Sequence, residues 1–528
     1  MATHASDSEK SDGMSSNDVE GETLHPVETN SVRPACFSST IQEVLCVLTA
    51  TMAIGMSAWL SGSVIVLSSF VGRDLDMSQA QITWIASSSS LTSGAFLLFF
   101  GRVADLFGRK TLVVGSFLLF AIVCLGSGFS NTGITLDVLN GVLGLFSASA
   151  IPSAQGILGI AYGKPSRRKN AAFACFSAGN PLGFVFGIFA GGVTTSILNW
   201  RASYWFLAII MFIFAIIGLF TIPKDHTDKQ PLTWQTIKGF DIVGTMLTVA
   251  GIGMFSAALS LGSTAPQGWQ TGYVLGMLIG GIACMIAFVF WEMWFKDPIM
   301  PMDIWKDRNF TLCLSIMMLG FTAFAPAAFW AALYFQRVWN FSALMTAVHV
   351  LPMAVSGILV NVIAALVLHR ISNKLLMYIG AAAYAIAFLL FAMNRTSSSY
   401  WAFYFPGFAI QVIGADLEFN VSNMYVMSSM PSWRQSTAGS IYQTGAKLSM
   451  TLGFGITTAL YDAVSKSSGL ASYWDVAVQP YAVTFWFAFA CSALSLFLVP
   501  FLTIGTQGGR EKPREAEEAS PVAKIEDM

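Results

Sequence analysis

Apolar stretches long enough to cross a lipid bilayer recur along almost the whole chain. Crossing the hydrocarbon core as an α-helix takes about 20 mostly apolar residues. Hydrophobic residues make up 55% of the 528-residue chain and charged residues only 11%, an apolar share above that of soluble domains. We identify fourteen such segments, at 41–67, 79–100, 111–130, 134–161, 171–195, 202–222, 240–263, 271–295, 309–335, 342–368, 375–393, 400–428, 437–464 and 481–505. The sequence therefore predicts an all-α polytopic membrane protein with 14 transmembrane spans.

The distribution of lysine and arginine predicts the orientation of these spans. With the N-terminus in the cytoplasm, cytoplasmic segments hold 22 of the 28 basic residues and outer loops hold five. Cytoplasmic loops are generally rich in Lys and Arg, so we expect both termini inside. Residues 1–40 and 506–528 are polar or charged, and we expect them to be disordered tails. No apolar segment begins before about residue 41, so the first span is expected to act as its own insertion signal.

Composition also argues against several classes of protein. The formal net charge of −1 gives no reason to expect a nucleic-acid partner. The seven cysteines are scattered and form no CxxC pair, so no metal site and no disulfide framework is predicted. No GxxxxGK motif is present, and no loop carries a cluster of His, Asp and Glu. We therefore expect neither an enzyme nor a cofactor, but a monomer whose partners are the bilayer, small organic molecules and protons.

The segment "GRVADLFGRK", residues 101–110, places four charged side chains between two uncharged apolar runs. It resembles the cytoplasmic signature of the major facilitator superfamily, which lies between the second and third spans. The resemblance implies an acid that locks two halves together in the outward-open state, with its partner here near Arg434 and Ser436. The alternative is an ordinary basic turn. The residues of this gating motif are Gly101, Arg102, Asp105, Gly108, Arg109 and Lys110.

The same resemblance implies an architecture of two six-helix bundles with two inserted helices. Residues 41–222 would form the N-terminal bundle, 223–308 the inserted helices and their linkers, and 309–505 the C-terminal bundle. Fourteen spans, the run "SLTSGAFLLFFGRVADLFGRK" and "GADLEFNVSN" at 414–423 together resemble the fungal 14-span drug:proton antiporters, with the aminotriazole-resistance-like branch nearest. Transport between two halves by alternating access is the expectation that follows.

The fifth predicted span carries small residues at every fourth position, which gives one flat helix face and permits close helix approach. Exporters of the superfamily have a Gly- and Pro-rich motif here that is associated with antiport. Asn180 stands where a glycine usually precedes the proline. The alternative is close packing without any bearing on transport direction. The motif consists of Gly179, Pro181, Gly183, Gly187 and Gly191.

Three charged residues fall inside predicted spans, where each costs about 3 kcal/mol on insertion scales. Asp416 and Glu418 lie in the twelfth span and Lys447 in the thirteenth, all at a depth of about 15–18 Å. The two carboxylates are about 200° apart around the helix, so only one can face Lys447. We hypothesise that one carboxylate exchanges protons between the two sides of the membrane, with Lys447 tuning its pKa. A static ion pair is the alternative.

His349, in the tenth predicted span, is a further candidate for proton coupling because histidine titrates near neutral pH. A hydrogen-bonding residue that only packs is the alternative. The predicted substrate pocket lies between the halves, where aromatic faces with few polar groups suit flat, amphipathic organic compounds. The alternative is that these aromatics face lipid or the membrane interfaces. Candidate lining residues are Trp59, Trp84, Ser88, Phe329, Trp330, Tyr334, Asn361, Gln411 and Tyr442.

The function expected from these features is secondary active export of a drug, toxin or secondary metabolite, driven by exchange for protons. A facilitator or importer of a nutrient on the same fold is the first alternative, and a membrane-embedded sensor is the second. The plasma membrane is the expected location, with the vacuolar membrane as the alternative.

Overall fold

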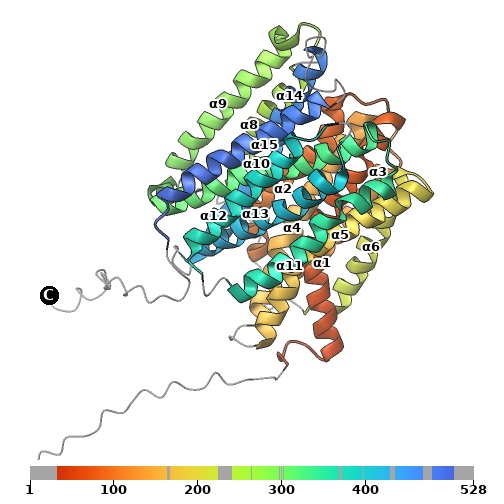
Figure 1. Ribbon diagram of the computed structural model, residues 1–528. Helices are drawn as coiled ribbons and strands as arrows, with labels where there is room; N and C mark the ends of the chain where they lie inside the picture. Colours follow the sequence, from red (N-terminus) through yellow and green to blue (C-terminus); the bar gives the residue numbers. More distant parts are fainter. Residues whose placement is uncertain are drawn as a thin grey trace, which may run out of the picture.

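The computed structural model describes residues 33–162, 167–223, 241–262, 265–295, 298, 300, 302–367, 371–395, 398–428, 435–467 and 478–504. Within these ranges the long elements are fourteen helices of 20 to 35 residues, and no strand occurs (Figure 1). They are α1 (Thr40–Asp74), α2 (Gln79–Phe107), α3 (Arg109–Gly128), α4 (Gly133–Ala161), α5 (Arg167–Ile197), α6 (Trp200–Thr221), α8 (Ile242–Leu261), α9 (Gly272–Trp294), α10 (Arg308–Arg337), α11 (Ala343–Val367), α12 (Asn373–Ala392), α13 (Tyr400–Ser428), α14 (Gln435–Ser467) and α15 (Gln479–Leu498).

Eleven of these helices are long and apolar enough to cross a membrane, which confirms the predicted all-α membrane protein. The three others are α2, α13 and α14, whose sequences hold the serine run 87–90 and the buried polar and charged residues discussed below. They pack among the eleven, but the total of 14 crossings stays a prediction. Both predicted tails lie almost entirely outside the described residues.

The same pattern of helix pairs occurs twice in the chain. In the first six helices, α1 packs on α5, α2 on α4 and α3 on α6. In the last six, α10 packs on α14, α11 on α13 and α12 on α15, so each partner recurs at the corresponding position. We call α1–α6 the N-terminal half and α10–α15 the C-terminal half. This repetition is the arrangement of secondary transporters built from two related bundles.

The helices between the halves form a hairpin on the side of the bundle. α8 and α9 pack on each other, and α8 also contacts α2 and α14, while α9 lies at the edge (Figure 1). The carboxylate of Asp241 accepts hydrogen bonds from the backbone of Gly244 at 2.7 Å and from the Trp291 indole at 2.7 Å. The start of α8 is thereby tied to the end of α9.

Several contacts between the two halves lie at one end of the bundle. We call this the distal end, where α1 ends, and the end where α1 begins the proximal end. The Gln336 side chain on α10 donates to the Val66 carbonyl on α1 at 2.6 Å. The Thr458 hydroxyl on α14 donates to the Thr83 hydroxyl on α2 at 3.0 Å. A hydrophobic cluster with members from both halves surrounds these bonds. In this conformation the distal end is closed.

Candidate functional site

The predicted gating motif forms the turn between α2 and α3. Gly108 alone joins the two helices, and its φ of 103° lies in the region that favours glycine. Lys110 donates to the Ile222 carbonyl at the end of α6 at 2.6 Å. Arg109 lies against α4, where a Cβ atom on Gly156 would overlap its guanidinium group. The motif thus joins α3 to α4 and α6 within the N-terminal half.

The predicted lock between the halves lies largely outside the described residues. Arg102 and Asp105 belong to α2, but their side chains are not among those described, and the same holds for Ser436 on α14. Arg434 is outside the described ranges altogether. Gly101, on α2, has Pro152 of α4 as its nearest neighbour, at 3.7 Å from a Cβ built on it. That distance is ordinary contact, so the locking role of the motif stays a prediction.

The glycine face of α5 lies directly on the backbone of α1. Cβ atoms built on Gly179, Gly183 and Gly187 would overlap the carbonyl oxygens of Thr51, Gly55 and Trp59. A Cβ on Gly191 would lie 3.1 Å from the Ser63 Cα, and the Ser63 hydroxyl donates to the Gly187 carbonyl at 3.0 Å. Pro181 lies inside α5, beside this face. The contact makes α1 and α5 one closely packed pair.

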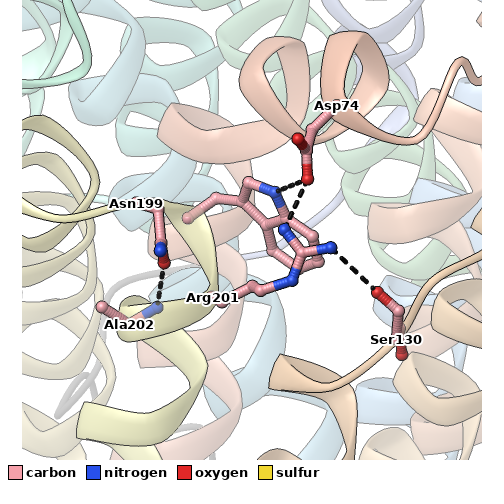
Figure 2. A network of polar contacts seen from close by, with 6 residues as sticks. Asp74, Ser130, Asn199, Arg201 and Ala202 are labelled. Carbon is pink, nitrogen blue, oxygen red and sulfur yellow. Dashed lines mark hydrogen bonds and ion pairs between the residues drawn. The ribbon is translucent and has the colours of Figure 1, made fainter.

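Two ion pairs connect helix ends within the N-terminal half. At the distal end, Asp74 of α1 accepts hydrogen bonds from Arg201 and, at 2.9 Å, from the Trp200 indole of α6 (Figure 2). Arg201 also donates to the Ser130 carbonyl at 3.3 Å, as Figure 2 shows. At the proximal end, buried Glu43 accepts from Arg168 at 2.6 Å and from the Tyr162 hydroxyl at 2.8 Å. Both ends of α1 are therefore fixed to its own half.

Asp416 belongs to a polar group between α11 and α13. The Asn361 amide donates to the Asp416 carboxylate at 2.9 Å and to the Gly357 carbonyl at 2.9 Å. Asn420, one helical turn after Asp416, donates to the Asn361 side-chain oxygen at 3.5 Å. Asn361, a predicted pocket residue, therefore contacts Asp416, a predicted proton-coupling residue.

Glu418 faces the interior of the C-terminal half and is 0% exposed. One carboxylate oxygen accepts from the Ser495 hydroxyl of α15 at 3.0 Å, whereas the other is buried and has no hydrogen-bond partner among the described residues. This second oxygen fills the space beside Gly320 of α10, where a Cβ atom would overlap it. The hydroxyl of Tyr384, whose ring also borders Gly320, is likewise buried without a partner. A change of charge at Glu418 therefore takes place in a buried interior, where charge is costly.

Lys447 points across to the other half. Its ammonium group donates to the Ser57 hydroxyl on α1 at 3.2 Å. Its stem lies against α2, where a Cβ on Gly94 would come within 2.8 Å of the Lys447 Cβ. None of the ion pairs between described side chains joins Lys447 to Asp416 or to Glu418. Sequence reasoning missed Ser57, whose only signal is a hydroxyl inside an apolar span.

Most of the predicted pocket aromatics are packed inside the protein in this conformation. Phe329, Trp330 and Tyr334 are each 0% exposed, and the Trp330 ring stacks on Tyr461 with centroids 4.5 Å apart. Trp59 stacks on Phe186 of α5 at 5.9 Å, within its own half. In this conformation these side chains pack against other aromatic side chains of their own halves, so their role as pocket residues stays a prediction.

Three of the remaining candidates, Gln411, Tyr442 and His349, pack against neighbouring residues, and the other two line a groove. Gln411 donates to the Met353 sulfur at 3.4 Å, and the Tyr442 hydroxyl donates to the Phe419 carbonyl at 2.9 Å. The His349 ring contacts Tyr400, with centroids 4.5 Å apart, and its Nδ1 lies 2.8 Å from the Met345 carbonyl oxygen. Trp84 and Ser88 line a groove of about 420 Å³ between α2 and α4, with Leu91, Thr92, Phe96, Asp137, Val138, Gly141, Val142 and Leu145. The described residues hold no metal-binding cluster of His, Cys, Asp or Glu.

Two related helical bundles with charged and polar side chains in their interior and at their interface define a membrane transporter of the secondary type. The family model of the major facilitator superfamily matches residues 47–453. The chain belongs to this superfamily, and it is a transporter and not an enzyme. The resemblance drawn from residues 101–110 is thereby confirmed at the level of the family.

Curated relatives cover most of the chain at low identity. An efflux pump of Aspergillus terreus, terJ, is 26% identical over 86% of this chain and 90% of its own length. The aminotriazole resistance protein of Saccharomyces cerevisiae is 24% identical over 71% of this chain and 69% of its own length. The low affinity ammonium transporter of the same yeast is 29% identical over 73% of this chain and 75% of its own length.

Solved structures share the fold. The peptide transporter POT in complex with sulfate aligns with a TM-score of 0.61 at 15% identity, covering 87% of this chain and 94% of that one. A point mutant of the nucleoside transporter NupG aligns with a TM-score of 0.59 at 14% identity, covering 87% of this chain and 100% of that one. These similarities show the fold alone.

Proposed function

We propose that this transporter exports small organic compounds by alternating access, in exchange for protons. The observation that carries the proposal is the arrangement of three ionisable side chains within a bundle of membrane-spanning helices: Glu418, which is fully buried, and Asp416 and Lys447, which are partly buried. Such residues are costly in a bilayer and mark the pathways of protons and substrates. The names of relatives, an efflux pump of Aspergillus terreus and a multidrug transporter of Aspergillus fumigatus, support export.

The proposed mechanism has two states, one closed at the distal end and one closed at the proximal end, and the contacts observed between the halves belong to the first. The distal contacts of Gln336 and Thr458 hold this end closed. We place the distal end on the outer face of the plasma membrane and both termini in the cytoplasm, as the basic residues predict. Opening the distal end requires these bonds to break. The other state would be held by Asp105 of the gating motif, acting from the proximal end.

Proton exchange is assigned to the two carboxylates of α13, which face different surroundings. Asp416 lies on Asn361 of α11, and Glu418 lies among α10, α12 and α15. A proton gained or lost at either group changes the local charge, and the hydrogen bonds to Asn361 or Ser495 change with it. His349 stays a candidate for the same task near the distal end.

The test has two parts. Growth of an exporter-depleted yeast expressing the chain, on a panel of toxins with and without a protonophore, identifies a substrate. Transport of that substrate is then measured in proteoliposomes with an imposed pH gradient, for Asp416→Asn, Glu418→Gln and the control Asp76→Asn. Asp76 lies in the α1–α2 turn with a φ of 49°, which asparagine also tolerates. We expect gradient-driven transport to be lost in at least one of the first two variants and retained in the control. If both variants keep it, proton exchange at these groups is wrong.

A second candidate is the import of ammonium, favoured by the 29% identity to the low affinity ammonium transporter of Saccharomyces cerevisiae. Whole-cell measurements separate the two directions. Deletion of an exporter raises the amount of substrate inside the cell, whereas deletion of an importer lowers it. Methylammonium uptake serves as the probe for the second candidate.

A further inference from the structure

The groove between α2 and α4 combines apolar walls with a carboxylate. Asp137 contributes a buried side-chain oxygen to which no described residue donates a hydrogen bond. The Ser88 hydroxyl on α2, which also lines the groove, is buried and likewise has no hydrogen-bond partner among the described residues. Most other lining residues are apolar. A polar group buried without a partner is costly, and a carboxylate especially so, so a ligand that supplies the missing partner would be stabilised at this pair of groups.

The groove lies on the α2–α4 side of the N-terminal half, next to the contact of α2 with α14. All of its lining residues belong to α2 and α4 of the N-terminal half, and Val138 at its edge is 60% exposed. Trp84 and Phe96 pack against a cluster of Leu91 and Ala95 of α2 and Leu448 of α14. Val249 and Ile252 of α8 pack against the same cluster, so both α14 and the inserted hairpin flank the groove. Since the sides of such a bundle face lipid, the groove is accessible from the membrane.

The chemistry of the lining selects one kind of occupant. A carboxylate in apolar surroundings binds a cation, and the aromatic faces of Trp84 and Phe96 add cation–π attraction. One carboxylate and one hydroxyl are too few oxygen ligands for Mg²⁺ or Ca²⁺, which take about six or more. The volume of about 420 Å³ falls within the range of small-molecule sites, roughly 300–1,000 Å³. An organic cation with large apolar groups has the charge that the carboxylate binds, needs few oxygen ligands, and fits a groove of this volume.

We propose that the α2–α4 groove is a lipid-accessible binding site for hydrophobic organic cations, with Asp137 as the counter-charge. The site deepens the proposed function by naming a substrate class, and it rests on that function only for its physiological use. Ligand that has partitioned into the bilayer would bind at the groove before it reaches the space between the halves.

The test measures binding to the purified full chain in lipid nanodiscs, with no ion gradient. The probes are radiolabelled tetraphenylphosphonium and tetraphenylborate, which have the same shape and opposite charge, and empty nanodiscs give the background. We expect the cation to bind and the anion not to bind. Asp137→Asn should weaken cation binding by at least about tenfold. Leu145→Trp, which fills the groove and keeps the carboxylate, should do the same, and Asp76→Asn should leave binding unchanged.

The proposal is overturned if Asp137→Asn binds the cation as well as the unsubstituted protein does, or if the unsubstituted protein does not distinguish the two probes. Thermal unfolding of each variant shows whether it is folded, and Leu145→Trp still decides the matter if Asp137→Asn is not. The experiments distinguish a failure of the proposed binding site from a failure of the proposed export function. Cation binding without any transport contradicts the proposed function alone, and transport without binding at the groove contradicts this inference alone.

Discussion

The ammonium group of Lys447, on α14 of the C-terminal half, donates a hydrogen bond to the hydroxyl of Ser57, on α1 of the N-terminal half, at 3.2 Å. Ser57 is buried, with 9% of its surface exposed. Because the two helices belong to different halves, the bond must break whenever the halves separate at this level. A charge in the interior of the bundle thus takes part in the contact that a rocking motion has to open and close.

Replacing Lys447 with methionine should reduce transport by about tenfold or more, because the charged donor between the halves is lost. Methionine keeps an unbranched stem beside Gly94, so the packing of α14 on α2 should survive. Ser57→Ala removes only the acceptor and should have a smaller effect. Transport rates in proteoliposomes, normalised to folded protein, check this. Transport by Lys447→Met at the unsubstituted rate would show that the charge is dispensable.

Gly187→Ala should destabilise the protein, because the new Cβ atom would overlap the Trp59 carbonyl oxygen on α1. Overpacking of this kind typically costs about 1–3 kcal/mol. Gly115→Ala on α3 is the matched control, since a Cβ atom there meets nothing within 4 Å. Thermal unfolding in detergent compares the two variants. Equal midpoints would contradict the close contact of α1 and α5.

The sequence carries enough information to predict the helices, because long apolar runs in a bilayer have no other stable conformation. The run predicted at 202–222 corresponds to α6, Trp200–Thr221, and the run at 271–295 to α9, Gly272–Trp294. The family signature is also readable, since a turn with a glycine at positive φ depends on a few neighbouring residues. The positions of the helices, which depend on the length of the apolar runs, and the turn between α2 and α3, which depends on local sequence, can therefore be predicted.

The surroundings of individual side chains cannot be predicted in this way. Lys447 and Ser57 are 390 positions apart in the chain, so no local pattern connects them. The sequence predicts that Trp330 lines a pocket, yet the residue is fully buried, because an aromatic side chain at helical spacing suits a core as well as a cavity. Asp137 becomes a candidate only when the structure places it beside Ser88.

Gly320→Ala should impair proton-driven transport to a degree similar to Glu418→Gln, although it leaves the carboxylate in place. The new methyl group would overlap one Glu418 carboxylate oxygen and must displace it from its position beside Tyr384. Gly276→Ala on α9 is the control, because a Cβ atom there meets nothing within 4 Å. The measurement is substrate transport with and without an imposed pH gradient. If Gly320→Ala keeps the full stimulation by the gradient, the position of Glu418 is not critical for coupling.

Cross-linking the distal contact should stop transport reversibly. The hydroxyl oxygens of Thr83 on α2 and Thr458 on α14 are 3.0 Å apart, so cysteines at both positions bring two sulfur atoms together. The double variant Thr83→Cys and Thr458→Cys is made after replacement of the seven native cysteines, and each single variant is a control. We expect oxidation to abolish transport by the double variant alone and reduction to restore it. A cross-linked protein that transports at the normal rate would mean that the halves need not separate at this end.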